Sequence, residues 1–195
     1  MKTTSKLIPV LIGLFAISFS STGNAQAVKA KLTHAEKTVM VGGAPMYPSK
    51  NIVENAVNSK DHTTLVAAVK AAGLVETLSS AGPFTVLAPT NEAFAKLPSG
   101  TVNNLLLPEN KSTLTKVLTY HVLAGKYSLQ DLWSAVVKGG GKADFKTVEG
   151  ENLTFWIKGK DLYATDVKGN SAKITISNVN QSNGVIHVID TVLLP

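Results

Sequence analysis

The chain has 195 residues, of which 44% are hydrophobic and 6% aromatic, and its formal net charge is +6 at pH 7. Low aromatic content and the lack of a basic run with interleaved aromatic residues argue against nucleic acid as a partner. The sequence contains no cysteine, which excludes disulfides and thiol chemistry, so stability has to come from a hydrophobic core.

Residues 1–27 are predicted to be a cleaved secretory signal. Two lysines precede a short apolar run at 7–19, and the sequence Ala-Gln-Ala at 25–27 supplies the small residues of a cleavage site. The apolar run is shorter than the roughly 20 residues that a membrane-spanning helix needs. We therefore expect an exported chain that begins near Val28, lacks a membrane span, and works in the periplasm or outside the cell.

Residues 28–47 are predicted to form a lead-in arm that lies on the domain. Glycines and prolines between positions 42 and 48 exclude a long regular element there. A single domain is predicted to follow over residues 48–195, and its first half is expected to be helical.

Three short helices are predicted between Asn51 and Pro83. The first is expected to bury one apolar face: Ile52, Val53, Ala56 and Val57. The second is expected to bury an apolar stripe: Leu65, Val69 and Ala72. Gly73 is predicted to stop the second helix, and the Gly-Pro pair at 82–83 breaks the third.

An abrupt corner follows at residues 84–98. The apolar run at 84–88 predicts a buried strand, and Pro89 fixes the turn into a helix. The Thr90 hydroxyl is expected to cap that helix, with Asn91 in its first turn. The corner contains neither a serine nor a histidine that could form a nucleophile and base, so we interpret it as a structural joint.

A second short helix is predicted to be capped by Thr101, and a longer one begins near Pro108. The longer helix carries apolar residues and one histidine at positions that share a face: Leu114, Val117, Leu118 and His121.

Beyond Gly125, the sequence predicts strands that are short, rich in β-branched residues and separated by turn residues. Hairpin turns are predicted at 158–160 and 168–170. Helices first and strands afterwards predict an α+β domain with antiparallel pairing.

The titratable residues show no pattern of a catalytic or metal site, so we expect no enzymatic activity, no cofactor and no bound metal. The histidines lack the spacing of metal ligands. His121 and His187 lie among apolar residues and are expected to be buried and hydrogen-bonded. The acidic residues of the second half are expected in solvated loops: Asp144, Glu149, Glu151, Asp161 and Asp166.

Three stretches resemble the fasciclin domain family: FTVLAPTNEAFAKLP at 84–98, LTYHVLAGKYS at 118–128 and GVIHVIDTVLLP at 184–195. They occur in the family's order. The resemblance implies a wedge-shaped β-sandwich with helices packed around it, and a role in adhesion or protein–protein contact. The first and last stretches contain residues to which we assign structural roles: Thr90, Asn91, His187 and Asp190.

The resemblance also supplies two candidate partner-binding pairs. Tyr120-His121 matches a pair implicated in adhesion, although a core-packing role fits these residue types equally well. Asn178-Val179 occupies the place of an Asp-Ile pair that is associated with integrin binding in animal relatives. An amide cannot supply the carboxylate that a receptor-bound cation needs, which argues against integrin-type recognition.

Two functions from different classes follow from these observations. The first is adhesion through contact with an unidentified cell-surface or matrix protein, together with weak self-association. The alternative is an extracytoplasmic carrier of a small apolar or sugar ligand. A large closed apolar cavity would favour the carrier, whereas an exposed apolar patch rimmed by polar groups would favour adhesion.

Overall fold

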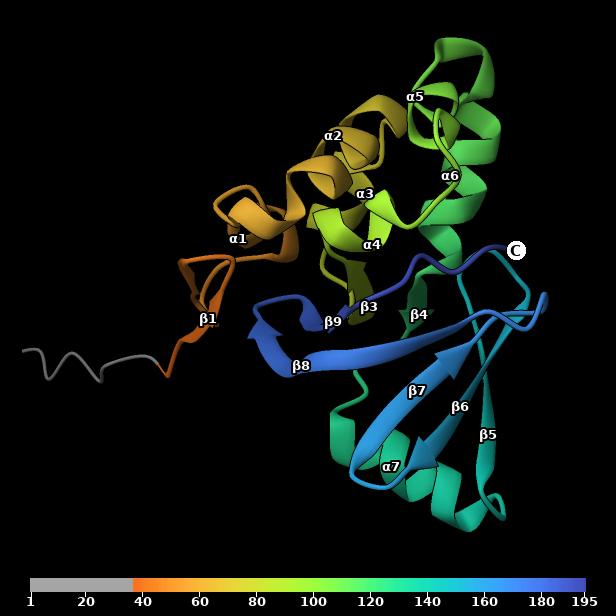
Figure 1. Cartoon of the computed structure of the whole chain (residues 1–195). Helices are drawn as coiled ribbons and strands as arrows, with labels where there is room; N and C mark the ends of the chain where they lie inside the picture. Colours follow the sequence, from red (N-terminus) through yellow and green to blue (C-terminus); the bar gives the residue numbers. More distant parts are fainter. Residues whose placement is uncertain (1–36) are drawn as a thin grey trace, which may run out of the picture. The chain divides into compact units, whose positions relative to one another are not determined.

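A computed structural model describes residues 37–195, so the predicted signal and the first part of the lead-in arm lie outside the described residues. The domain is α+β, as predicted (Figure 1). The helices are α1 Ile52–Ala56, α2 Thr63–Ala72, α3 Val75–Ser79, α4 Asn91–Ala95, α5 Thr101–Leu105, α6 Lys111–Tyr120 and α7 Leu129–Lys138, with 3-10 turns η1 Lys60–His62 and η2 Pro108–Asn110. The strands are β1 Val39–Val41, β2 Ala44–Met46, β3 Phe84–Pro89, β4 Val122–Ala124, β5 Lys142–Lys146, β6 Asn152–Lys158, β7 Asp161–Thr165, β8 Ser171–Gln181 and β9 Gly184–Ile189.

Seven strands form one sheet in the order β4-β3-β9-β8-β7-β6-β5. The 11-residue strand β8 belongs to both halves of the sheet. The sheet folds over so that its two edges approach each other, and Leu123 of the edge strand β4 forms an antiparallel bridge with Thr147, just after the other edge strand β5. The predicted wedge-shaped sandwich is therefore confirmed, with its two layers joined through β8.

The prediction of antiparallel pairing is wrong for one central pair. β3 and β9 run parallel, with Phe84 opposite Gly184 and Pro89 opposite Ile189. Both strands are almost entirely buried, and a continuous apolar run covered on both faces is typical of a parallel pair. The parallel pair brings the first and the last fasciclin-like stretches side by side.

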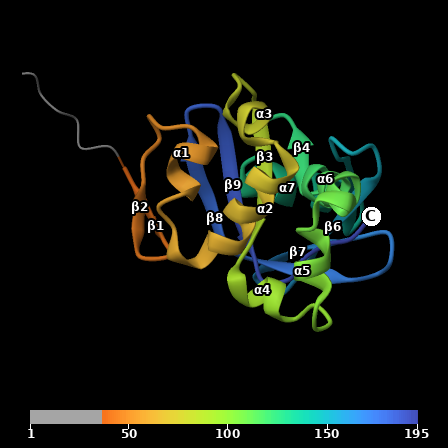
Figure 2. The ribbon, with the colours of Figure 1, turned by 90° about the horizontal axis from the view of Figure 1, so that it is seen from above.

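The sheet separates two hydrophobic cores. One core, which we call the helical core, lies between the helices α1 to α6 and the face of β3 and β9. Figure 2 shows α1, α2 and α3 lying over this part of the sheet. The other core, which we call the inner core, fills the space between the two layers. There, Leu132 and Val136 of α7 pack with Leu153 and Phe155 of β6. The opposite face of β5, β6 and β7 therefore faces solvent.

The lead-in arm contributes a hairpin that the sequence did not predict. β1 and β2 pair through Gly42 and Gly43, whose φ angles of +57° and +76° suit a tight hairpin turn. Val41 and Met46 are buried in the helical core. The arm therefore supplies part of the core, and the Gly42 carbonyl accepts a hydrogen bond from Lys60 N at 3.1 Å.

Two predicted details of the helical half are wrong. Val57, the residue after α1, is 48% exposed, whereas Asn55 of α1 is buried, with its side chain bonded to the backbone of Tyr47 and the side chain of Gln181. In α5, Thr101 is already the first helical residue and caps nothing. By contrast, α2 buries its predicted stripe and ends at Gly73, which has the expected left-handed φ of +74°.

Helix α7 and strand β4 were not predicted. The beginning of α7 carries a recognisable capping box, in which Ser128 Oγ accepts from Asp131 N and Asp131 accepts from Ser128 N. Leu132 and Val136 then follow at helical spacing and are fully buried. The capping residues and the apolar spacing of this helix can be recognised in the sequence, but the β-branched stretches that follow favoured a prediction of strands.

Candidate functional site

The Tyr120 side chain is fully buried at the end of α6. Its hydroxyl donates to Asn152 O at 3.0 Å and accepts from Val167 N at 3.2 Å. Burial raises the pKa of this phenol to about 12, so the hydroxyl keeps its proton. Tyr120 thus joins α6 to the start of β6 and to the turn after β7.

His121 is buried beside Tyr120 and uses both ring nitrogens. Nδ1 lies 2.8 Å from Val117 O and Nε2 accepts from Leu193 N at 3.1 Å, which fixes a neutral ring with its proton on Nδ1. Burial lowers the pKa of His121 to about 4. His121 therefore attaches the C-terminal segment to α6, and a partner-binding role for this pair stays a prediction.

The second candidate pair lies at an irregularity of β8. The pairing register with β9 shifts between Ile176 and Val179, and Asn178 takes a left-handed φ of +57°. The Asn178 side chain is exposed, but its Oδ1 accepts from Leu129 N at 2.8 Å and so caps α7. Val179 is buried in the helical core. Partner binding by Asn178-Val179 likewise stays a prediction.

His187 supports the same irregularity from β9. It is fully buried, and its Nε2 lies 2.9 Å from Tyr127 O, while its Nδ1 accepts from Asn178 N at 3.4 Å. These partners place the proton on Nε2, the opposite tautomer to that of His121. Burial lowers the pKa of His187 as well.

The corner after β3 has the geometry of a joint. Thr90 Oγ1 accepts from Ala93 N at 3.2 Å, which is the predicted cap of α4. Asn91 reaches outside its own helix: its Oδ1 accepts from Thr64 N at 3.0 Å and its Nδ2 donates to Lys60 O at 2.9 Å. Since α2 has no cap from its own preceding residue, Asn91 takes that role.

Not all acidic residues of the second half lie in solvated loops. Asp166 is buried, not solvated, because its carboxylate accepts from the backbone of Lys168, Asn170 and Leu194. Asp190 Oδ1 accepts from Lys173 N at 2.9 Å and so links the end of β9 to β8. Both carboxylates therefore organise the backbone.

A feature missed by the sequence analysis lies on the solvent face of β5, β6 and β7. The strand register aligns Lys142, Trp156, Tyr163 and Lys173 in one row across four strands. The Trp156 and Tyr163 rings are stacked, with centroids 4.7 Å apart, and both side chains are half-buried. The sequence signal for this feature was an aromatic residue at an outward position in each of two successive strands whose residues alternate between inward and outward. We call these four residues the aromatic row.

The surroundings of the aromatic row are polar. Trp156 Nε1 donates to Thr165 Oγ1 at 2.8 Å, and Thr165 Oγ1 lies 2.7 Å from Ser171 Oγ. The Lys173 ammonium lies 2.7 Å from Asp161, which raises the lysine pKa. These contacts hold the indole in one orientation above an open hollow that is lined by Trp156, Lys142 and the neighbouring hydroxyls.

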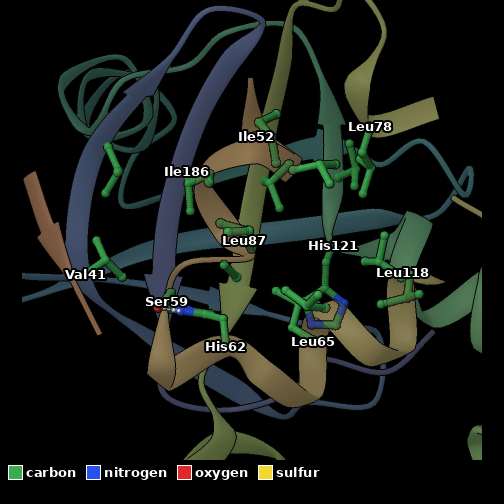
Figure 3. A pocket seen from close by; sticks show the side chains of 18 of the residues that line it. Val41, Ile52, Ser59, His62, Leu65, Leu78, Leu87, Leu118, His121 and Ile186 are labelled. Carbon is green, nitrogen blue, oxygen red and sulfur yellow. Dashed lines mark hydrogen bonds between the residues drawn. The ribbon is translucent and has the colours of Figure 1, made fainter. Parts of the chain in front are cut away.

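A cavity of about 60 Å³ lies in the helical core, beneath α1, α2 and α3 (Figure 3). Its lining is almost wholly aliphatic, with residues such as Ile52, Leu65 and Ile186. His62 is buried at the lining, with Nδ1 at 2.8 Å from Ser59 Oγ. His62 Nε2 has no hydrogen-bond partner among the described residues. Burial lowers the pKa of His62.

Neither a metal site nor a membrane helix is found in the part of the chain that the structure describes. Residues 37–195 contain no group of three or more His, Asp or Glu side chains that could hold a metal ion. Within the same range, no helix has the length and apolar character needed to cross a bilayer.

Comparison with known proteins identifies close relatives. The family model of the Fasciclin domain matches residues 60–195. Protein sll1483 of Synechocystis sp. is 46% identical over 196 residues, a match that covers 100% of this chain and 99% of the relative. The immunogenic protein MPB70 of Mycobacterium bovis is 38% identical over 72% of this chain and 66% of its own.

A solved structure shows the same fold. A FAS1 domain pair from the insect cell adhesion molecule fasciclin I superposes with a TM-score of 0.67 at 16% sequence identity. The match covers 83% of this chain and 59% of that chain.

Proposed function

The chain belongs to the fasciclin domain family, and from this premise we propose that it is an exported adhesion module that binds a cell-surface or matrix protein through the aromatic row. Export is supported by the signal-like pattern of residues 1–27. Adhesion is supported by the fold that the chain shares with a domain pair of an insect cell adhesion molecule.

The observation that carries the proposal is the stacked pair Trp156 and Tyr163 on a solvent-facing sheet. Tryptophan and tyrosine are enriched among the residues that dominate binding energy at protein interfaces. Here the rings are already held by each other and by the bond to Thr165, so binding would cost little side-chain entropy. The rigid pair provides a preformed contact surface.

The charge around the row indicates the chemistry of the partner. Lys142, Lys146 and Lys158 are exposed on the outward positions of β5 and β6, where Asp144 is also exposed. Asp161, opposite Lys158, has a side chain that is 41% exposed and is paired with Lys173, so the lysines still outnumber the carboxylates on this face. A patch with this excess of positive charge attracts an acidic protein surface and raises its association rate at low ionic strength. The proposed partner is therefore an acidic surface or matrix protein.

The test is binding of the immobilised chain to the native envelope and medium fractions. Trp156→Ala is expected to weaken partner binding by about 30-fold or more, as loss of an aromatic hot spot does. Thermal unfolding is measured alongside, so that affinity is compared between folded proteins.

Val137→Ala is the matched control, because Val137 is a large apolar side chain that is 63% exposed on α7, away from the row. It is expected to leave affinity unchanged. A Trp156→Ala protein that folds and binds like the wild type would contradict the proposal.

A further inference from the structure

The cavity beneath α1, α2 and α3 is unusual for a protein core. Native cores are packed like organic crystals and contain few voids larger than one water molecule. This void measures about 60 Å³, several times the roughly 10–15 Å³ that one water needs. Its aliphatic lining offers too few polar partners to hold ordered water, and apolar cavities of this kind stay dry and accept small apolar molecules.

His62 adds a specific polar group to this apolar space. The ring is 3% exposed and its Nδ1 is engaged with Ser59 Oγ, while Nε2 lacks a hydrogen-bond partner among residues 37–195. Buried polar side-chain atoms without a partner are rare. His121 lines the same cavity, but both of its nitrogens are bonded to the backbone of Val117 and Leu193. Of these two rings, His62 has the less engaged nitrogen: its Nε2 lacks a close hydrogen-bond partner in the described part of the chain, and a weaker interaction with the Ala88 backbone counters part of the effect of burial on its pKa.

The contacts of His62 define the ligand group it would accept. Burial disfavours the imidazolium, so the ring is neutral. A neutral ring whose Nδ1 is paired with a hydroxyl presents either an N–H or a lone pair at Nε2. An alcohol or phenol hydroxyl can both donate and accept, and it therefore pairs with either tautomer.

The route to the cavity is also apolar. Val53 on α1, Val66 on α2 and Val75 on α3 are half-buried members of the lining, so they lie between the cavity and the surface. Ala56 lies among them on α1. The turn of the β1–β2 hairpin closes over Ser59, since a Cβ placed on Gly42 would lie 2.3 Å from Ser59 Oγ.

We propose that this cavity is a binding site for a compact apolar alcohol or phenol, whose hydrocarbon body fills the aliphatic space and whose hydroxyl bonds His62 Nε2. The site goes beyond the proposed adhesion and uses the helical layer, whereas adhesion uses the solvent face of β5 to β7. The fold therefore carries two independent recognition sites.

Phenol and toluene are the probes, because they have nearly the same shape and differ in the hydroxyl. Titration calorimetry with the full mature chain is expected to show phenol binding about five- to ten-fold more tightly than toluene, the value of one hydrogen bond. His62→Leu is expected to abolish the preference for phenol. Ala56→Phe, which fills the entrance, is expected to weaken both probes.

A measurement on the wild-type chain removes any dependence on how the variants fold. With nitrogen-15 histidine, phenol is expected to shift the Nε2 resonance of His62 and to leave those of His121 unchanged, whereas toluene leaves the Nε2 resonance of His62 near its free value. Three results would overturn the proposal: binding of neither probe, equal affinity for both in the wild type, or a phenol-induced shift confined to other histidines.

Discussion

Tyr120 stabilises the domain by joining segments that are distant in sequence. Its hydroxyl partners, Asn152 and Val167, lie 32 and 47 residues further along the chain. A sequence pattern can place Tyr120 at the end of a helix, but it contains no information on which backbone groups a buried hydroxyl will meet. For this reason the sequence alone leaves the choice between a binding role and a packing role for Tyr120 open.

Replacement of Tyr120 by phenylalanine tests this role. Tyr120→Phe keeps the ring but leaves Asn152 O and Val167 N without their partner, and is expected to lower the free energy of unfolding by about 1–3 kcal/mol. The control is Tyr163→Phe, since the half-buried Tyr163 hydroxyl makes no side-chain hydrogen bond within the described residues. Urea midpoints decide the matter, and equal midpoints for the two variants would refute the structural role of Tyr120.

The buried histidines predict a pH dependence of stability. The pKa of His121 is lowered from 6.5 to about 4 by folding. Between these values the unfolded chain binds a proton that the folded chain does not bind. The contribution of neutral His121 to the free energy of unfolding is therefore fully present above pH 6.5 and is lost as the pH falls toward 4. One such group contributes a slope of up to about 1.4 kcal/mol per pH unit.

Urea unfolding at several pH values between 7.5 and 4.5 measures this slope. The pKa values of His62 and His187 are lowered in the same direction, so the decline is expected to exceed that of a single group. The variant His121→Gln is expected to show a shallower decline than the wild type. A free energy of unfolding that stays constant across this range would show that the histidines are not buried as neutral rings.

Among the helices and strands, the sequence predicts those whose own residues show a clear apolar pattern bounded by turn residues. The strand at 84–88 and the helix that ends at Gly73 follow from apolar periodicity and turn residues. The parallel pairing of β3 with β9 could not be derived, because it joins segments about 100 residues apart and depends on burial of both strand faces. The aromatic row was missed for a similar reason, since it exists only when four strands align.

The corner between β3 and α4 offers a test at this scale. Thr90→Ala removes the bond to Ala93 N and is expected to lower the free energy of unfolding by about 0.5–2 kcal/mol. Thr90→Ser keeps a hydroxyl at the same position and is expected to have a smaller effect. Denaturant midpoints of the two variants provide the comparison, and a Thr90→Ala protein as stable as the wild type would mean that the cap contributes nothing.

In the whole domain, the residues that hold the fold together and the proposed binding surface lie on different sides of the sheet. Of the signature pair, Tyr120 is buried in the inner core and His121 lines the cavity of the helical core, whereas the aromatic row lies on the solvent-exposed side of β6 and β7. Substitution within the row can therefore change binding while the cores remain packed. From this separation we propose that partners contact the aromatic row rather than the buried pair Tyr120-His121.

Hydroxyl-radical footprinting of residues 28–195, free and bound to the native envelope fraction, tests this proposal. Oxidation of Trp156 and Tyr163 is expected to fall on binding, while Trp133, which packs against the inner core, serves as the internal control and is expected to stay unchanged. Unchanged oxidation of Trp156 and Tyr163, together with protection of the exposed Met40 and Tyr47 of the lead-in hairpin, would contradict it.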